Sequence, residues 1–132
     1  METHRLVLPG DLNQFGDLFG GQLLAWVDEA SWIAASLDYP ECRFVTIGMD
    51  QVAFRHGVRE GTILVIESQK VAQGTTSVSY QVVVRRGRSD DEGDIFSTRV
   101  TFVNLDALGE KCPISPLAGP HFRRADGGEK EA

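Results

Sequence analysis

The stretch from Asn13 to Leu37 contains residue types that can act on a carbonyl group. Asp28 and Glu29 are the only charged residues between Gly21 and Leu37. A helix that is apolar on nearly every other side must be buried over most of its surface. A carboxylate in such a helix is costly unless it is paired, lies at an interface or takes part in chemistry. Asp28 is therefore a candidate general base or nucleophile, and the alternative is an acid that faces solvent beside Glu29.

The adjacent glycines Gly20 and Gly21 are expected at the start of this helix. Backbone N–H groups at a helix N-terminus lie at its positive end, where they can stabilise an oxyanion, although a plain turn is the simpler alternative. Gly20 and Asp28 are eight residues apart, about 12 Å along a helix. Because that separation is too long for both to act on one carbonyl, the catalytic interpretation predicts a dimer in which Asp28 faces the partner's helix start.

Asn13 precedes the glycines in a segment that is expected to be a loop. Its side-chain amide could hold an attacking water or a carbonyl oxygen. Asparagine in a loop is more commonly a turn residue, and the residues alone leave both interpretations open.

Apolar spacing predicts one long helix and five strands around these residues. The helix is expected from Gly21 to Leu37 and is ended by Tyr39-Pro40. A short strand is expected at 3–8, and alternating polar and apolar residues predict four more at 44–54, 62–71, 76–86 and 94–105. The core face of the helix is predicted from residues at helical spacing: Leu23, Trp26, Val27, Ala30, Ile33, Ala34 and Leu37.

The order of these elements predicts an α+β fold. Short turns between the four longer strands make them antiparallel. One sheet and one apolar helix bury their apolar surfaces most economically when the sheet wraps around the helix. The domain is expected to span residues 1–118, followed by a flexible tail at 119–132 that has almost nothing to bury.

Composition excludes several classes of protein. The chain has 132 residues, of which 42% are hydrophobic and 24% charged, enough for one domain with its own core. Its formal net charge of −6 argues against general nucleic-acid binding. No apolar run approaches the roughly 20 residues that span a bilayer, and the first residues lack the features of a signal peptide. We therefore expect a cytoplasmic protein with free thiols. No metal site is predicted, because the histidines and cysteines of the chain are not clustered in the sequence: His4, His56, His121, Cys42 and Cys112.

Residues 5–117 resemble the hotdog-fold acyl-CoA thioesterases, and within them the brain-type and YciA-type acyl-CoA hydrolases. The most specific motif is Asn13-x-x-Gly16-x-x-Phe19-Gly20-Gly21, with six residues between Gly21 and Asp28. Weaker motifs complete the resemblance: Pro9-x-Asp11-x-Asn13, Val45-Thr46-x-x-Met49-Asp50-x-Val52-x-Phe54, Gly74-x-Thr76-Ser77, Val84-Arg85-Arg86, Thr101-Phe102-Val103 and Pro113-Ile114-Ser115-Pro116-Leu117.

The resemblance implies a hotdog dimer, often assembled further into a trimer of dimers, that hydrolyses acyl-CoA at sites shared between subunits. Asp28 matches the family's catalytic aspartate and Asn13 its catalytic asparagine. Gly20 or Gly21 matches the glycine whose N–H faces the thioester oxygen. No metal or organic cofactor is implied, and CoA enters only as part of the substrate and product.

Six further residues are candidates for binding the substrate. Arginine suits the CoA phosphates, with solvated charges at a strand end as the alternative, and hydroxyl groups can contact pantetheine or phosphate. One or two of the aromatic residues can border the acyl channel, with a core or interface position as the simpler alternative: Trp26, Trp32, Phe44 and Phe54. A histidine can line the CoA groove, and a surface histidine is the alternative. The six candidates are Thr76, Ser77, Arg85, Arg86, Phe54 and His56.

Two other functions are compatible with a hotdog fold. One is a non-catalytic module that binds acyl-CoA as a sensor. The other is a hydratase or dehydratase that acts on acyl thioesters, but such enzymes typically pair a histidine with an acid, and no histidine lies in or beside residues 13–28. The acyl chain length, and the choice between base and nucleophile for Asp28, are left open.

Overall fold

The computed structural model describes residues 1–88 and 93–114. The predicted boundary at residue 118, the tail at 119–132 and His121 lie outside them. The long helix and the five strands begin and end within two residues of the predicted limits, and a short 3-10 helix that the sequence pattern does not predict precedes the long helix. The elements are β1 (Glu2–Leu6), the short 3-10 helix η1 (Pro9–Asp11), α1 (Gly20–Asp38), β2 (Phe44–Phe54), β3 (Ile63–Gln73), β4 (Ser77–Arg86) and β5 (Asp94–Asn104).

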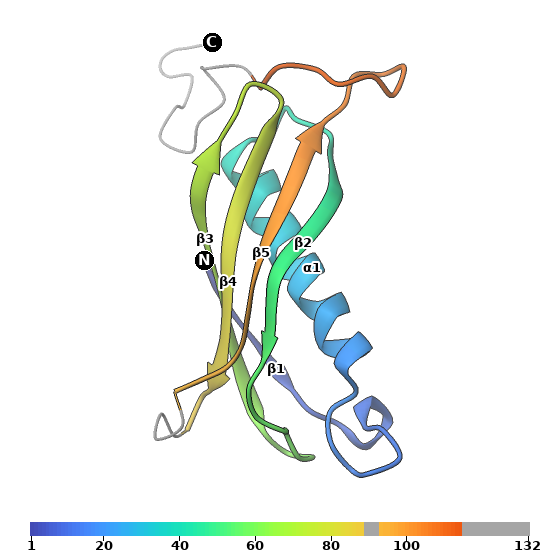
Figure 1. The fold of residues 1–132 in the computed structure, drawn as a ribbon, viewed down its shortest axis with the longest axis vertical. Helices are drawn as coiled ribbons and strands as arrows, with labels where there is room; N and C mark the ends of the chain where they lie inside the picture. Colours follow the sequence, from blue (N-terminus) through green and yellow to red (C-terminus); the bar gives the residue numbers. More distant parts are fainter. Residues whose placement is uncertain (89–92, 115–132) are drawn as a thin grey trace.

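The five strands form one sheet in the order β1-β3-β4-β5-β2, and α1 lies across one of its faces (Figure 1). Neighbouring strands are all antiparallel, as predicted. The segment between β2 and β3 is not a hairpin turn, however, because β2 does not pair with β3. It pairs with β5 at the edge of the sheet. Val58, in the crossing segment, is buried, and its carbonyl accepts the Leu18 N–H at 2.7 Å. This contact fixes the crossing segment against the loop that precedes α1.

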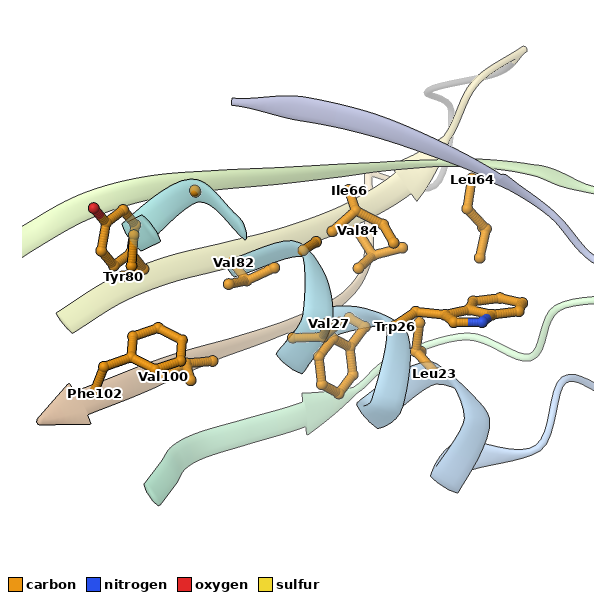
Figure 2. Close-up of a cluster of buried hydrophobic side chains, with 14 of the residues drawn as sticks. Leu23, Trp26, Val27, Leu64, Ile66, Tyr80, Val82, Val84, Val100 and Phe102 are labelled. Carbon is orange, nitrogen blue, oxygen red and sulfur yellow. The ribbon is translucent and has the colours of Figure 1, made fainter. Parts of the chain in front are cut away.

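The core lies between α1 and the sheet (Figure 2). Side chains of Leu23, Trp26 and Val27 on α1 meet alternate residues of the sheet. The alternation predicted for the two central strands is confirmed, since the core-facing residues that have no exposed surface include Val82, Val84, Phe96, Val100 and Phe102. Burial of this kind is the main driving force for folding.

The predicted core face of α1 is wrong at two positions. Ile33 is 39% exposed and Leu37 is 62% exposed, whereas Ser31 and Ala35 are fully buried. The small side chains of Ser31 and Ala35 let the helix approach the sheet closely. The Ser31 hydroxyl is satisfied by the Val27 carbonyl at 2.9 Å, so its burial leaves no unpaired polar atom.

The edge strand β2 is long and apolar on its surface. Four of its large hydrophobic residues are exposed: Val45 (42%), Ile47 (58%), Val52 (42%) and Phe54 (53%). An edge strand with these properties presents unpaired backbone groups and is a ready site for pairing with another chain.

No helix in the described part of the chain is long and apolar enough to cross a membrane. Residues 1–88 and 93–114 also contain no group of three or more histidine, cysteine or acidic side chains placed to hold a metal ion.

Candidate active site

Asp28 lies in the third turn of α1 and is half-buried. Its Oδ1 accepts a hydrogen bond of 2.7 Å from the Oγ1 of Thr46 in β2. Its Oδ2 has no hydrogen-bond partner among residues 1–88 and 93–114, and it can therefore accept a proton. The acid that faces solvent is Glu29, which pairs with Arg5. Asp28 is thus held at the edge strand of the sheet.

The helix start is uncapped at the two glycines. The N-cap residue Phe19 supplies no side-chain acceptor, and the first turn of α1 has no acid. Asp11 lies nearby, but its carboxylate already accepts the Gln22 side-chain amide at 2.8 Å and the N–H of Leu8 at 2.9 Å. These two bonds lower the pKa of Asp11. The N–H groups of Gly20 and Gly21 have no acceptor among the described residues, and so they can donate to an incoming oxyanion.

A surface hollow of about 450 Å³ opens beside this helix start. Gly21 and Phe19 form part of its wall, together with Asp11. A β-carbon on Gly21 would lie 2.7 Å from the Phe19 ring, so a larger residue there would displace the ring. Glycine therefore leaves room beside the free N–H groups.

Asn13 builds the turn that leads into α1. Its Oδ1 accepts the N–H groups of Phe15 at 2.9 Å and Asp17 at 3.1 Å. Arg59 reinforces the turn by donating to the carbonyls of Phe15 and Gly16 and to the Asp17 carboxylate at 3.1 Å. The Nδ2 of Asn13 has no partner in the described part of the chain. The turn therefore fixes the side chain while its amide hydrogens stay free for a ligand.

Asp28 and the glycines of the same chain contact opposite ends of β2. Thr46, which holds Asp28, is near the start of β2, whereas Phe54 is its last residue. A β-carbon on Gly20 would lie 3.5 Å from the Phe54 ring, so the helix start packs at the far end of the strand. One carbonyl cannot be reached by both groups within one chain.

The six predicted substrate-binding residues fall into two groups. Thr76 and Ser77 lie where β4 begins, and the Thr76 carbonyl accepts the N–H of Asn104 at 2.8 Å. Asn104 is paired with Phe44 at the start of β2. Thr76 and Ser77 are therefore at the same end of the sheet as Thr46, the residue that holds Asp28.

The second group lies at the end of the sheet where α1 begins. Arg86 donates to the carbonyl of Gly57 at 2.9 Å, beside the exposed residues Phe54 and His56. Arg85 pairs with Glu2 at 2.8 Å and with Glu67 at 3.0 Å, and these carboxylates raise its pKa. Arg85 is thus already in an ion-pair network with two carboxylates.

Two residues at the site have no strong signal in the sequence. Threonine is an ordinary strand residue, and the contact of Thr46 with Asp28 depends on how the helix is positioned over β2. Trp32 is 43% exposed, and its Nε1 donates to the Phe44 carbonyl at 3.0 Å. Trp32 thus contacts β2 two residues before Thr46, the residue that Asp28 contacts.

This architecture, a five-stranded antiparallel sheet wrapped around one long helix, is the hotdog fold, as predicted. Among solved structures, Cj0915, a hexameric hotdog fold thioesterase of Campylobacter jejuni, superposes with a TM-score of 0.75 at 39% identity, over 86% of this chain and 88% of that one. Residues 15–92 match the family model of the thioesterase superfamily. The chain belongs to this superfamily.

Relatives of known name agree with the predicted resemblance to YciA-type hydrolases. YciA of Salmonella typhimurium, an acyl-CoA thioester hydrolase, is 33% identical over 119 residues, which cover 86% of this chain and 88% of the relative. YkhA of Bacillus subtilis, an uncharacterized acyl-CoA thioester hydrolase, is 32% identical over 112 residues, and the match spans 82% of this chain and 63% of YkhA.

An acyl-CoA hydrolase from Staphylococcus aureus gives a comparison at the level of residues. Its structure in complex with butyryl coenzyme A and coenzyme A superposes with a TM-score of 0.74 at 30% identity, over 86% of this chain and 68% of that one. Alanine variants of that enzyme replace an asparagine and an aspartate that are fifteen residues apart. Asn13 and Asp28 have the same separation. A third variant replaces a threonine seventeen residues after the aspartate, and Thr46 follows Asp28 by eighteen.

Proposed function

We propose that this chain hydrolyses acyl-CoA thioesters to a free carboxylic acid and CoA, at sites shared between two copies. The observation that carries the proposal is the Asp28 carboxylate, which Thr46 holds at the open edge strand and whose second oxygen has no partner among the described residues. The names of the relatives and the CoA complexes of the Staphylococcus aureus enzyme support the choice of substrate.

The edge strand gives a route to a shared site. In a two-fold dimer formed by antiparallel pairing of β2 with its copy, the start of one strand lies beside the end of the other. Thr46 is near the start and Phe54, which covers Gly20, is at the end. This pairing would bring the partner's helix start toward Asp28, and it would place the Thr76 group and the partner's Arg86 group on either side of one site.

The proposed reaction uses groups that the chain supplies. A water molecule, oriented by the Asn13 amide, attacks the thioester carbonyl carbon while Asp28 accepts its proton. The N–H groups of Gly20 and Gly21 stabilise the oxyanion that forms. When the tetrahedral intermediate collapses, the carbon–sulfur bond breaks, and the thiolate of CoA receives the proton from Asp28. In the alternative, Asp28 attacks the carbonyl carbon directly, and the carbon–sulfur bond breaks to release the thiolate of CoA. Water then hydrolyses the resulting anhydride to the free acid and restores the Asp28 carboxylate.

The proposal includes no metal and no organic cofactor, because a carboxylate base and backbone donors suffice for the steps above. The hexameric assembly of the Campylobacter jejuni thioesterase supports a further proposal, that the dimers of this chain associate as a trimer. Location in the cytoplasm stays a prediction, consistent with the two free thiols.

The test is a thiol-release assay on the purified chain with acyl-CoAs from two to sixteen carbons. We expect turnover in the wild type, and a loss of about 10²- to 10⁴-fold in kcat for Asp28→Asn, the usual range for a general base. Thermal unfolding of the variant should match the wild type, which excludes misfolding as the cause.

Two outcomes would contradict the proposal. Tight binding of acyl-CoA without thiol release would support the sensor module. Full activity in Asp28→Asn would remove Asp28 from the reaction.

A further inference from the structure

A mostly apolar pocket lies next to Asp28, at the start of β2. Its volume is about 370 Å³. Its apolar wall includes the indole of Trp32, the side chains of Phe44 and Val45 in β2, and Leu105 just after β5. Trp32 and Phe44 are among the aromatic residues that the sequence offers for an acyl channel, whereas none of the six predicted substrate-binding residues lines this pocket.

Two of the polar groups around this pocket are engaged within the chain. The indole Nε1 of Trp32 donates to the Phe44 carbonyl at 3.0 Å. The Asp106 carboxylate accepts the N–H groups of Leu108 at 2.9 Å and Glu110 at 3.0 Å. Arg43 also lines the pocket, and its guanidinium donates to the Asp106 carbonyl at 3.4 Å. The rest of the wall is mainly apolar, which suits a hydrocarbon chain.

The pocket lies on the same face of α1 as Asp28, one helical turn further along the helix. Asp28 and Trp32 are four residues apart on α1 and so lie on one face of the helix, one turn after the other. Asp28 reaches Thr46, and Trp32 reaches Phe44, two residues earlier in β2. Val45, between these two, forms part of the pocket wall. A chain attached to a carbonyl at Asp28 can extend along β2 directly onto the exposed face of the indole.

We propose that this pocket receives the acyl chain of the substrate, and that Trp32 is the residue that determines which chain lengths are favoured. The inference rests on the proposed function and deepens it. An acetyl group is too short to leave the catalytic centre, whereas a longer chain can extend the roughly 6 Å along α1 that separate Asp28 from Trp32. The contribution of Trp32 therefore grows with chain length until the indole is covered.

The test compares kcat/KM for acetyl-CoA and octanoyl-CoA in the wild type, Trp32→Ala and Trp32→Phe. We expect Trp32→Ala to lower the octanoyl value about tenfold or more relative to the acetyl value, as expected when apolar contacts in a pocket are lost. Trp32→Phe keeps an aromatic wall without the N–H, and its loss should be smaller. Ile33→Ala, a neighbouring exposed position outside the pocket, is the matched control and should leave the ratio unchanged.

The outcomes separate the inference from the function on which it rests. Equal losses for both substrates in Trp32→Ala, or no loss for either, would overturn the inference while acyl-CoA hydrolysis stands. If Trp32→Ala does not fold, the same ratio measured in Trp32→Phe decides, with an unchanged ratio counting against the inference. Failure of the wild type to release thiol from any acyl-CoA would instead overturn the proposed function.

Discussion

Asn13 uses the two polar atoms of its side chain in different ways. The oxygen holds the turn before α1 by accepting two backbone N–H groups. The nitrogen has no partner in the described part of the chain, so it can bind a water or a thioester oxygen. A structural and a catalytic role can therefore be separated by substitution.

Asn13→Asp keeps an oxygen acceptor for the turn and removes the amide donor. We expect kcat to fall by at least about tenfold, as for loss of a single donor at a reacting oxygen, while the thermal unfolding temperature stays close to that of the wild type. Asn13→Ala removes both functions and should lower stability as well. Full activity in a folded Asn13→Asp protein would show that Asn13 has only the structural role in the turn and no catalytic role.

At the scale of elements, the position of α1 over the sheet decides where the candidate catalytic groups lie. Side chains bind the helix to the strands at several positions, among them Asp28 to Thr46, Trp32 to the Phe44 carbonyl, and Asp38 to the hydroxyl of Tyr80. Tyr80 is buried, and burial together with the Asp38 carboxylate raises its pKa. It therefore remains a neutral donor at physiological pH.

Tyr80→Phe removes this donor and leaves the Asp38 carboxylate without it. We expect the free energy of unfolding to fall by about 1–2 kcal/mol, at the lower end for a hydrogen bond to a charged group because Asp38 is half-exposed. Urea denaturation followed by circular dichroism measures the change. An unchanged midpoint would show that the hydrogen bond between Tyr80 and Asp38 does not stabilise the end of α1.

The elements were more predictable from the sequence than their contacts. Strands β4 and β5 alternate clearly, so the buried residues, such as Val82 and Phe102, could be assigned. The helix has almost no polar face to orient it, and this is why Ile33 and Leu37 were misplaced. The contact between Asp28 and Thr46 could not be predicted, because it depends on the height of α1 over β2. The distance between Gly20 and Asp28 follows from helical rise alone. Because it is too long for both groups to act on one carbonyl, the need for a second subunit could be predicted from the sequence.

At the scale of the whole molecule, the exposed edge strand β2 connects the fold to the proposed activity. Ile47 is its most exposed large residue, at 58%. If two copies pair through this strand, the partner's β2 covers the exposed edge of the sheet. The same pairing brings the partner's helix start toward Asp28 and so completes the active site.

Ile47→Glu places like charges in the centre of such a pairing. We expect the variant to sediment as a smaller species than the wild type and to lose thioesterase activity, because charged edge residues oppose strand pairing. Val71→Glu is the control, since Val71 is 49% exposed on β3, away from β2. An active monomer of Ile47→Glu would contradict the shared site.

Complementation between two inactive variants tests the shared site most directly. Asp28→Ala and Asn13→Ala chains are co-expressed and purified together, and thiol release is compared with that of each variant alone. In a mixed two-fold dimer, one of the two sites would combine an intact Asp28 with an intact Asn13 and helix start. The account predicts recovery of about a quarter of wild-type activity when the chains pair at random. Activity no higher than that of either variant alone, in preparations shown to contain mixed dimers, would contradict it.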